Sequence, residues 1–242
     1  MQIIGDTHTH TVASGHAFST LLENVAQAKR LGHRFLATTD HTEGMPQAPH
    51  RWFFENLPGS VPRILDDVVI LRGCEANIRE DGTLDLREDI LEGLDWVIAS
   101  MHQHVLPAGL GEDVYTQLWL RMAEEPSVDV FGHMGQPKYR CDYRAVVEAM
   151  AKHRKILEVN SASSRVRKGS EENCLELLRL CREYGVEVVL STDAHFAAII
   201  GQVEPSVELV RRADFPEELI LNLDYPRFCR SLRERKGILL PE

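Results

Sequence analysis

Short apolar runs rich in β-branched residues alternate with longer amphipathic segments along the chain. This alternation is typical of strand–helix units around a parallel sheet, because such strands are buried on both faces whereas the covering helices bury only one. We count seven units and expect an α/β fold. The predicted strands cover residues 3–8, 35–39, 68–74, 96–100, 128–132, 156–159 and 186–191.

Turn and capping signals set several boundaries between these strands. Thr20 and Glu23 have the spacing of a capping box, so a helix should begin at this point. The sequence Asp-Gly-Thr at residues 81–83 predicts a small hairpin after the third strand. Four prolines between residues 46 and 62 predict a short or irregular second helix, and a last helix is expected around residues 226–236.

The composition is that of a globular protein. The 242 residues are 43% hydrophobic and 26% charged, and no apolar run approaches the roughly 18 residues of a membrane span. No repeat or linker interrupts the pattern, so we expect a single domain over residues 1–242. The first residues lack the basic and apolar regions of a signal peptide, so we expect a cytoplasmic protein without a membrane partner.

Cysteine usage and net charge argue against several functions. The five cysteines are odd in number and form no Cys-x-x-Cys pair, which disfavours a disulfide framework and a cysteine zinc site. The formal net charge of −10 disfavours bulk binding of nucleic acid, since such binding relies on Lys and Arg that displace counterions. An acidic protein can still present a positive pocket once divalent ions are bound in it.

Side chains able to bind metal follow the predicted strands. A single His-x-His pair is a weak signal, but the same placement recurs after strand upon strand. In parallel barrels the carboxyl ends of the strands meet at one mouth, where reactive groups gather. Mixed imidazole and carboxylate ligands are typical of catalytic zinc, iron or manganese sites. The residues concerned are His8, His10, His41, Glu75, His102, His133, Asp193 and His195.

The spacing within the first motif assigns two roles. Side chains at positions i and i+2 of a strand share a face, so Asp6, His8 and His10 should point the same way. Asp6 lies deepest, and we expect it behind the ligands, where it accepts the second ring N–H of a ligating imidazole. Asp40 should face away from His41 and is not expected to be a ligand.

Five other histidines fall outside this pattern, and one of them, His16, lies in a loop. His33 precedes the second strand and His153 ends a basic helix, so we expect both to be ordinary surface residues. His50 and His104 lie in loops at the expected mouth, where each either contacts substrate or caps a turn.

The motifs together resemble the PHP (polymerase and histidinol phosphatase) superfamily. Its pattern is Asp-x-His-x-His, Thr-Asp-His, a Glu, two isolated His and Asp-x-His, and all of these occur in order between residues 6 and 195. The sequences at residues 48–50, 75–78, 136–139 and 167–173 are similar to those of its stand-alone bacterial phosphatases.

The resemblance implies a distorted seven-unit (β/α)7 barrel with the metal site at the C-terminal ends of the strands. It also implies three divalent ions, with zinc favoured and manganese or iron as alternatives. When the ligands of the family are assigned to the matching motifs, the first ion would be held by His8, His10, Glu75 and Asp193. Glu75 would bridge to a second ion held by His102 and His133. The third would be held by His16, His41 and His195.

Such a site suits hydrolysis of a phosphomonoester by a metal-bridging hydroxide, with Glu75, Asp193 and His195 as the catalytic residues. Three divalent ions exceed the charge of two carboxylates and a hydroxide, so a phosphate dianion would be attracted. A basic segment precedes a helix expected to start near Ser170, and helix N-termini with cationic side chains bind anions. The alternative is that these basic residues only solvate a loop. The predicted substrate-binding residues are Arg165, Arg167, Lys168, Asn160 and His50.

Three alternative functions remain at this stage. Other members of the superfamily suggest a nucleotide or nucleic-acid 3′-end phosphoesterase, or a histidinol-phosphatase-like activity. A noncatalytic metal-bound interaction module is the alternative of a different class, although none of the nine ligands is missing. We expect a small phosphorylated substrate, and the sequence leaves the oligomeric state open.

Overall fold

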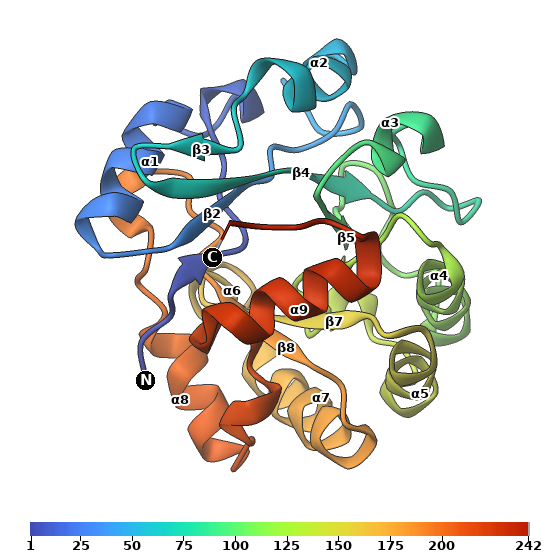
Figure 1. Cartoon of the computed structure of the whole chain (residues 1–242). Helices are drawn as coiled ribbons and strands as arrows, with labels where there is room; N and C mark the ends of the chain where they lie inside the picture. The colour runs from blue at the N-terminus through green and yellow to red at the C-terminus, as the bar shows by residue number, and fades with distance from the viewer. Residues whose placement is uncertain (242) are drawn as a thin grey trace.

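Seven parallel strands form a nearly closed barrel with helices around it in the computed structural model, which describes residues 1–241 (Figure 1). The strand order β1-β2-β4-β5-β6-β7-β8 follows the chain and confirms the expected distorted seven-unit (β/α)7 barrel. These strands are β1 (Gly5–Asp6), β2 (Phe35–Thr38), β4 (Val68–Asn77), β5 (Trp96–Ser100), β6 (Val130–Phe131), β7 (Ile156–Asn160) and β8 (Val188–Ser191). The helices are α1 (Leu21–Arg30), α2 (Trp52–Ser60), α3 (Glu88–Glu92), α4 (Glu112–Glu124), α5 (Tyr143–His153), α6 (Ser163–Val166), α7 (Ser170–Tyr184), α8 (Glu204–Arg212) and α9 (Tyr225–Lys236).

All seven predicted strands are confirmed, with differences in length. β1 and β6 have only two residues each, whereas β4 has ten and therefore contains Glu75 inside the strand. The sequence did not predict β3 (Ile64–Leu65), which pairs antiparallel with the start of β4. The turn between them has positive φ at Asp66 (49°) and Asp67 (67°), as in the tight turns that suit hairpins.

The predicted helix boundaries and turns are also confirmed. Thr20 caps α1 and forms the capping box with Glu23. α2 is short and contains Pro58. A bridge between Ile78 and Leu84 closes the predicted hairpin. No helix within residues 1–241 is long and apolar enough to cross a membrane.

A side chain completes the barrel between β8 and β1. The strands meet directly only at a bridge between Thr9 and Ala194. Below it, the buried Asn222 amide donates to the carbonyl oxygens of Gly5 (3.0 Å) and Leu190 (2.7 Å) and accepts from the Leu190 N–H (3.0 Å). These bonds take the place of a strand ladder, since the backbone groups at this seam would otherwise be buried without partners.

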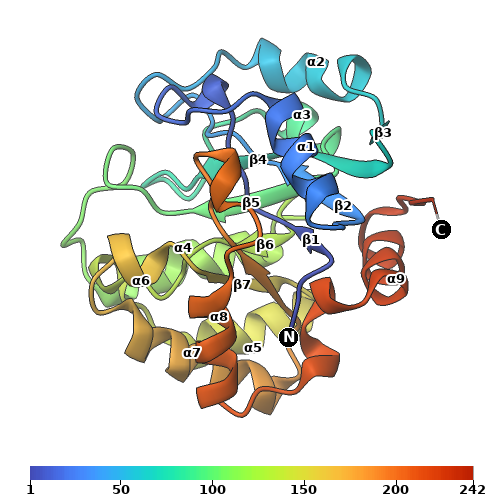
Figure 2. The same ribbon diagram turned by 90° about the vertical axis from the view of Figure 1, so that its left-hand side faces the viewer.

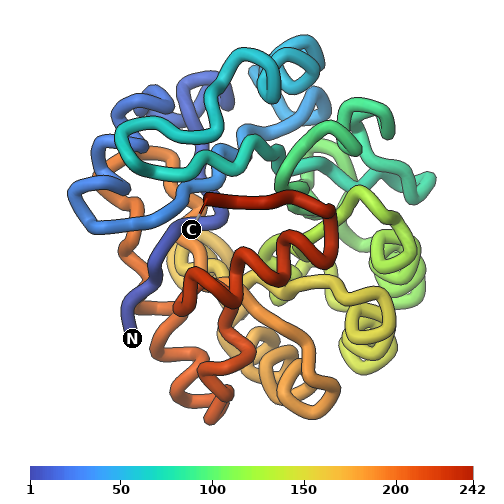
Figure 3. The backbone as a smooth tube through the Cα atoms, viewed as in Figure 1, coloured from blue at the N-terminus to red at the C-terminus, as the bar shows by residue number. Residues whose placement is uncertain are grey.

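Helix α9 closes the N-terminal end of the barrel. Phe228 stacks on Phe35 at 4.0 Å between ring centroids and contacts Trp96 at 5.7 Å. The segment after α9 runs back across the same end, where Tyr225 donates to the carbonyl oxygen of Pro241 (Figure 3). Figure 2 shows α9 and α6 at opposite ends of the barrel. Apolar side chains therefore fill the N-terminal end of the barrel. Polar side chains occupy the barrel interior only at the C-terminal end.

The alternation of side chains along β4 shows how the interior changes from one end to the other. Val69 and Leu71 belong to the apolar cluster under α9. Gly73 follows on the same face, and a Cβ there would lie 2.2 Å from the Trp96 carbonyl oxygen, so only glycine allows this close approach of β4 to β5. Glu75 and Asn77 come next on this face, at the C-terminal end.

Candidate metal centre

All nine predicted metal ligands lie together at the C-terminal end of the barrel. Three overlapping groups of side chains offer ligand atoms within 4.8 Å of one another. These groups are His10, His41 and His195; His8, His10 and Glu75; and His41, Glu75 and His102. The other three residues adjoin them, with His133 against Glu75 (2.9 Å), Asp193 against His10 (3.2 Å) and His16 against His195 (2.8 Å).

Glu75 is at the centre of the cluster. Its Oε1 lies 2.9 Å from Nε2 of His133 and 3.3 Å from Nε2 of His102. Its Oε2 lies 2.8 Å from Nδ1 of His41 and 3.4 Å from Nε2 of His8. Burial would raise the pKa of Glu75, but His102, His8 and His41 hold it well below its usual range. Each oxygen thus faces a different set of imidazoles, which is the arrangement of a carboxylate that bridges two cations.

Hydrogen bonds assign the tautomers of His8 and His10. Nδ1 of His8 lies 2.6 Å from a carboxylate oxygen of Glu158, so it carries the proton. Nδ1 of His10 lies 3.2 Å from Oγ of Ser14, whose hydroxyl donates to Asp40, so this Nδ1 also donates. When both rings are neutral, both Nε2 atoms present lone pairs to each other at 3.0 Å. Two lone pairs at this distance repel unless a cation lies between them, either a metal ion or, without one, a proton on the basic His8.

His16 and His195 repeat this arrangement at the rim. Nδ1 of His16 faces the Ser14 carbonyl oxygen at 2.9 Å, and Nδ1 of His195 faces the Asp193 carbonyl oxygen at 3.0 Å. Both must donate, so in the neutral rings their Nε2 lone pairs face each other at 2.8 Å. Two imidazole nitrogens about 2.1 Å from one ion would be about 3.0 Å apart at a right angle and about 3.4 Å apart at the tetrahedral angle. The two histidine pairs, at 3.0 and 2.8 Å, therefore lie close to the spacing of two ligands at a right angle on one ion.

Two buried polar atoms in the cluster support the same interpretation. Oε2 of Glu75 and Nδ1 of His41 lie 2.8 Å apart but do not have the geometry of a hydrogen bond, and neither has another hydrogen-bond partner among the described residues. Buried polar atoms are rarely left without partners, and a divalent cation would satisfy both. The donor set of imidazoles with a few carboxylates suits zinc, manganese or iron. The residues present therefore fit a metal cluster.

The electrostatics of the cluster favour a cation as well. Burial alone would lower the pKa of His8, yet Glu158, Glu75 and Asp193 together hold it well above its usual range. A single imidazole thus faces three carboxylates. The pKa of Asp193 is held well below its usual range by His8, His10 and Arg167, although burial acts in the opposite direction.

The two carboxylate oxygens of Asp193 have different partners. Oδ1 points to Nε2 of His10. Oδ2 accepts from the Asn160 amide (3.1 Å) and from the guanidinium of Arg167 (3.3 Å). The backbone of Asp193 has a φ of 53°, in the left-handed region, which is sparsely occupied by residues other than glycine. These contacts hold one oxygen toward the cluster.

The sequence analysis missed Glu158, which connects three parts of the site. Oε1 accepts from His8 and from the Ser191 hydroxyl (2.6 Å), and Oε2 accepts from the His133 N–H (2.7 Å). Glu158 lies in the middle of β7, where every residue is buried. A charged residue at a strand centre was the available signal, since a buried carboxylate requires partners.

Asp6 does not make the contact that we expected. Among the described residues it accepts from Thr192 (Oγ1 at 2.6 Å), from the backbone N–H of His8 and from that of Gly201, and from no imidazole nitrogen. Burial raises its pKa. Glu158 instead accepts the ring N–H, and Asp6 anchors the turn that leads to Asp193.

The imidazole of His102 is held by a buried polar network. Its Nδ1 lies 2.7 Å from the carbonyl oxygen of the Asn77 side chain. The Asn77 amide donates to Asp85 (2.6 Å) and to Thr42 (3.1 Å), and the Thr42 hydroxyl also donates to Asp85. These bonds fix the orientation of His102, with Nε2 toward Glu75.

A cavity of about 490 Å³ lies beside the cluster, and only some of the predicted substrate-binding residues line it. Arg165 and Arg167 line it, together with five of the predicted ligands, which are His16, His41, His102, Asp193 and His195. Lys168 and His50 are exposed and do not line this cavity, and Asn160 is bonded to Asp193. Of the expected anion-binding side chains, the structure thus brings only the two arginines to the cavity.

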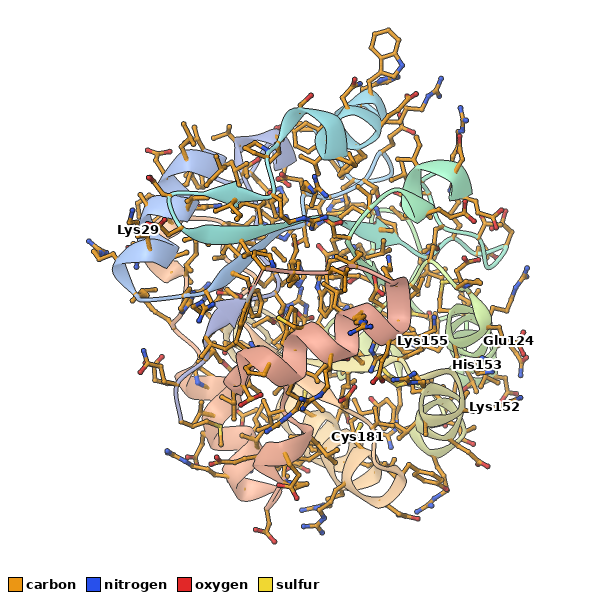
Figure 4. All side chains as sticks on the ribbon, in the orientation of Figure 1. Lys29, Glu124, Lys152, His153, Lys155 and Cys181 are labelled. Atoms are coloured by element: carbon orange, nitrogen blue, oxygen red, sulfur yellow. The ribbon has the colours of Figure 1, made fainter. Side chains whose placement is uncertain are left out.

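The histidines outside the motifs contribute no ligand atom to the three groups described above. The expectation that His33 is a surface residue is wrong, because it is only 6% exposed. It lies near Asp6, behind the site. His153 is half-buried at the end of α5, and Figure 4 shows it near Glu124 and Lys155. These three residues line a separate hollow together with Glu234 and Arg235 of α9. His104 is exposed.

Comparison with known proteins adds independent support. The model of the PHP domain matches residues 6–162. A probable phosphatase of Clostridium acetobutylicum is 40% identical over 237 residues, covering 97% of this chain and 96% of that protein. A probable phosphatase of Photobacterium profundum is 42% identical over 237 residues, with the same coverage.

A solved structure shares the fold. Histidinol phosphate phosphatase from Lactococcus lactis, complexed with zinc, L-histidinol and phosphate, superposes with a TM-score of 0.63 at 19% identity, over 88% of this chain and 94% of that chain. At this identity the likeness concerns the fold alone. The family match, in contrast, covers more than half of the chain, and the sequence relatives cover nearly all of it. The chain therefore belongs to the PHP domain family.

Proposed function

We propose that the protein is a metal-dependent phosphatase that hydrolyses phosphomonoesters with three divalent ions, zinc being favoured. The observation that carries the proposal is the close approach of Nε2 atoms in two histidine pairs, His8 with His10 (3.0 Å) and His16 with His195 (2.8 Å), in the same cluster as a Glu75 oxygen that has no hydrogen-bond partner among the described residues. The names of the relatives as probable phosphatases support it. So does the zinc, L-histidinol and phosphate complex of the structural neighbour.

We assign the ligands to three ions as the motifs imply. The first set is His8, His10, Glu75 and Asp193; the second is Glu75, His102 and His133; the third is His16, His41 and His195. Asp193 and His195 lie beyond the matched residues 6–162, so the proposed metallohydrolase domain extends over residues 1–242.

The ions would lower the pKa of a shared water and stabilise charge on the phosphoryl oxygens of an in-line displacement. The protein side chains would position the ions and bind the phosphate. Glu75 would set the distance between two ligand sets, and Glu158 would hold a proton on Nδ1 of His8 so that Nε2 is the nitrogen that faces the ion. Arg167 donates to Oδ2 of Asp193 and lines the cavity. The guanidinium of Arg165, which has no hydrogen-bond or ion-pair partner among residues 1–241, is available to a phosphate oxygen.

Metal content and phosphate release measured on the same samples test the proposal. The purified protein, supplemented with zinc or manganese, should hold close to three ions per chain and release phosphate from phosphomonoesters. His10→Ala should lower both quantities, whereas His153→Ala should leave both near wild type. No more than one ion per chain would overturn the cluster. Three ions without turnover of any phosphomonoester would overturn the activity and favour a noncatalytic metal-bound module.

A further inference from the structure

The mouth of the cavity beside the cluster is apolar on its surface. Of the eight phenylalanines of the chain, all within the described residues, only Phe18 (75%) and Phe196 (51%) are exposed, and both line this cavity. Val166, 60% exposed on α6, also lines it. A single exposed apolar side chain is ordinary, but the convergence of all exposed phenylalanines on one cavity marks a binding surface.

The two phenylalanines are held in position by their loops. Phe18 donates its backbone N–H to the carbonyl oxygen of His195 at 2.8 Å. One residue further along each loop, the N–H of Ala197 donates to the Ser19 hydroxyl at 2.9 Å. The backbone that carries each ring is therefore held beside a histidine of the cluster, Phe18 near His16 and Phe196 next to His195.

The cavity thus offers two kinds of surface to one ligand. Arg165 and Arg167 supply positive charge next to the histidines, and the two phenyl rings supply flat apolar faces at the mouth. A phosphate group alone would leave these rings in water. A planar ring attached to the phosphate through its alcohol would bury them and gain stacking contacts.

We infer that the substrate is a phosphomonoester whose alcohol carries a planar aromatic or heteroaromatic ring, which packs against Phe18 and Phe196. The inference rests on the proposed phosphatase function and adds a substrate class to it. Aromatic packing of this kind contributes roughly two- to tenfold to binding per ring pair. The effect should appear as selectivity for substrates with a ring over substrates without one.

Benzyl phosphate and ethyl phosphate test the inference, since both release a primary alcohol and they differ by a phenyl ring. Wild type should have the higher kcat/KM for benzyl phosphate. Phe18→Ala and Phe196→Ala should each lower the benzyl-to-ethyl ratio roughly two- to tenfold and leave ethyl phosphate turnover within about twofold. Trp52→Ala, which removes an aromatic side chain that is 66% exposed on α2 and outside the cavity, is the matched control and should not change the ratio.

Two further comparisons extend the test. One asks whether the ring can be a nucleotide base, and the other measures binding without turnover. Adenosine 5′-monophosphate against ribose 5-phosphate tests a nucleotide base, and a selectivity sensitive to the phenylalanines in either pair supports the inference. Calorimetric binding of benzylphosphonate and ethylphosphonate should show the same loss in the two variants. Equal turnover within each pair, or ratios unchanged in both variants, overturns the inference alone. Turnover of no substrate by the metal-loaded protein overturns the proposed function and the inference with it.

Discussion

Replacing Glu158 with Gln should weaken metal binding although Glu158 is not among the proposed ligands. The carboxylate accepts three hydrogen bonds, from Nδ1 of His8, from the Ser191 hydroxyl and from the backbone N–H of His133. An amide keeps only one acceptor oxygen. If the amide NH₂ of the new Gln side chain faces His133, it meets the backbone N–H of His133, and two donors face each other. If the NH₂ faces His8 instead, Nδ1 of His8 must accept a hydrogen bond. The ring proton then moves to Nε2, which has no lone pair left for an ion.

Both orientations therefore disturb one ligand set while keeping the shape of the side chain. Loss of such a supporting contact typically lowers metal affinity by about 10- to 100-fold, which corresponds to roughly 1.4–2.7 kcal/mol. Zinc affinity measured by competition with a chelator, together with metal content, would show this loss. The ¹⁵N shifts of the His8 ring would report its tautomer in the same variant.

Glu183→Gln is the matched control for Glu158→Gln. Glu183 is half-exposed and pairs with Arg144 on the surface, so the same chemical change there should leave zinc affinity unaltered. If Glu158→Gln binds zinc as tightly as wild type and His8 keeps its proton on Nδ1, then the tautomer argument for the cluster is refuted.

Three further changes probe the barrel, the cavity and the opposite end. Asn222→Leu should destabilise the fold by about 2–4 kcal/mol, because it leaves buried backbone groups of β1 and β8 without partners; urea unfolding would measure this. Arg165→Ala should raise KM more than it lowers kcat, whereas Lys152→Ala on the exposed side of α5 should change neither. Burial lowers the pKa of Lys155 to about 8 from 10.5, so the unfolded chain binds more protons between these values. Stability relative to a Lys155→Met variant should therefore increase as pH rises from 8 to 10.5, and a difference in unfolding free energy that is independent of pH would contradict it.

The fold was predictable because its signals are local. Apolar runs identified all seven strands, and the capping box at Thr20 and Glu23 identified the start of α1. Strand length was not predictable from the same signal. The apolar run around β6 extends beyond its two paired residues, whereas β4 continues through the charged Glu75, since pairing depends on the neighbouring strand and not on the run itself.

The site was predictable only where a motif repeats at strand ends. The roles of Asp6 and Glu158 were not, because each depends on partners far away in the sequence. Glu158 meets His8 across 150 residues, and Asp6 meets Thr192 across 186, so both contacts exist only once the barrel has closed. The position of His33 depends likewise on the segment around Gly201 that folds over it.

These contacts orient the side chains of the cluster, although its ligands other than Glu75 lie outside the strands. Ser14 shows the principle on one side of the site: its hydroxyl donates to Asp40 and receives hydrogen bonds from Nδ1 of His10 and from the N–H of His41. Glu158 does the same on the other side for His8 and His133. Glu158 reaches the cluster from β7, whereas Ser14 reaches it from a 3₁₀ turn, Val12–Ser14. The imidazoles are thus oriented before any ion binds, so binding need not fix their side chains, and the affinity of the site should depend on these two supporting residues as much as on a ligand.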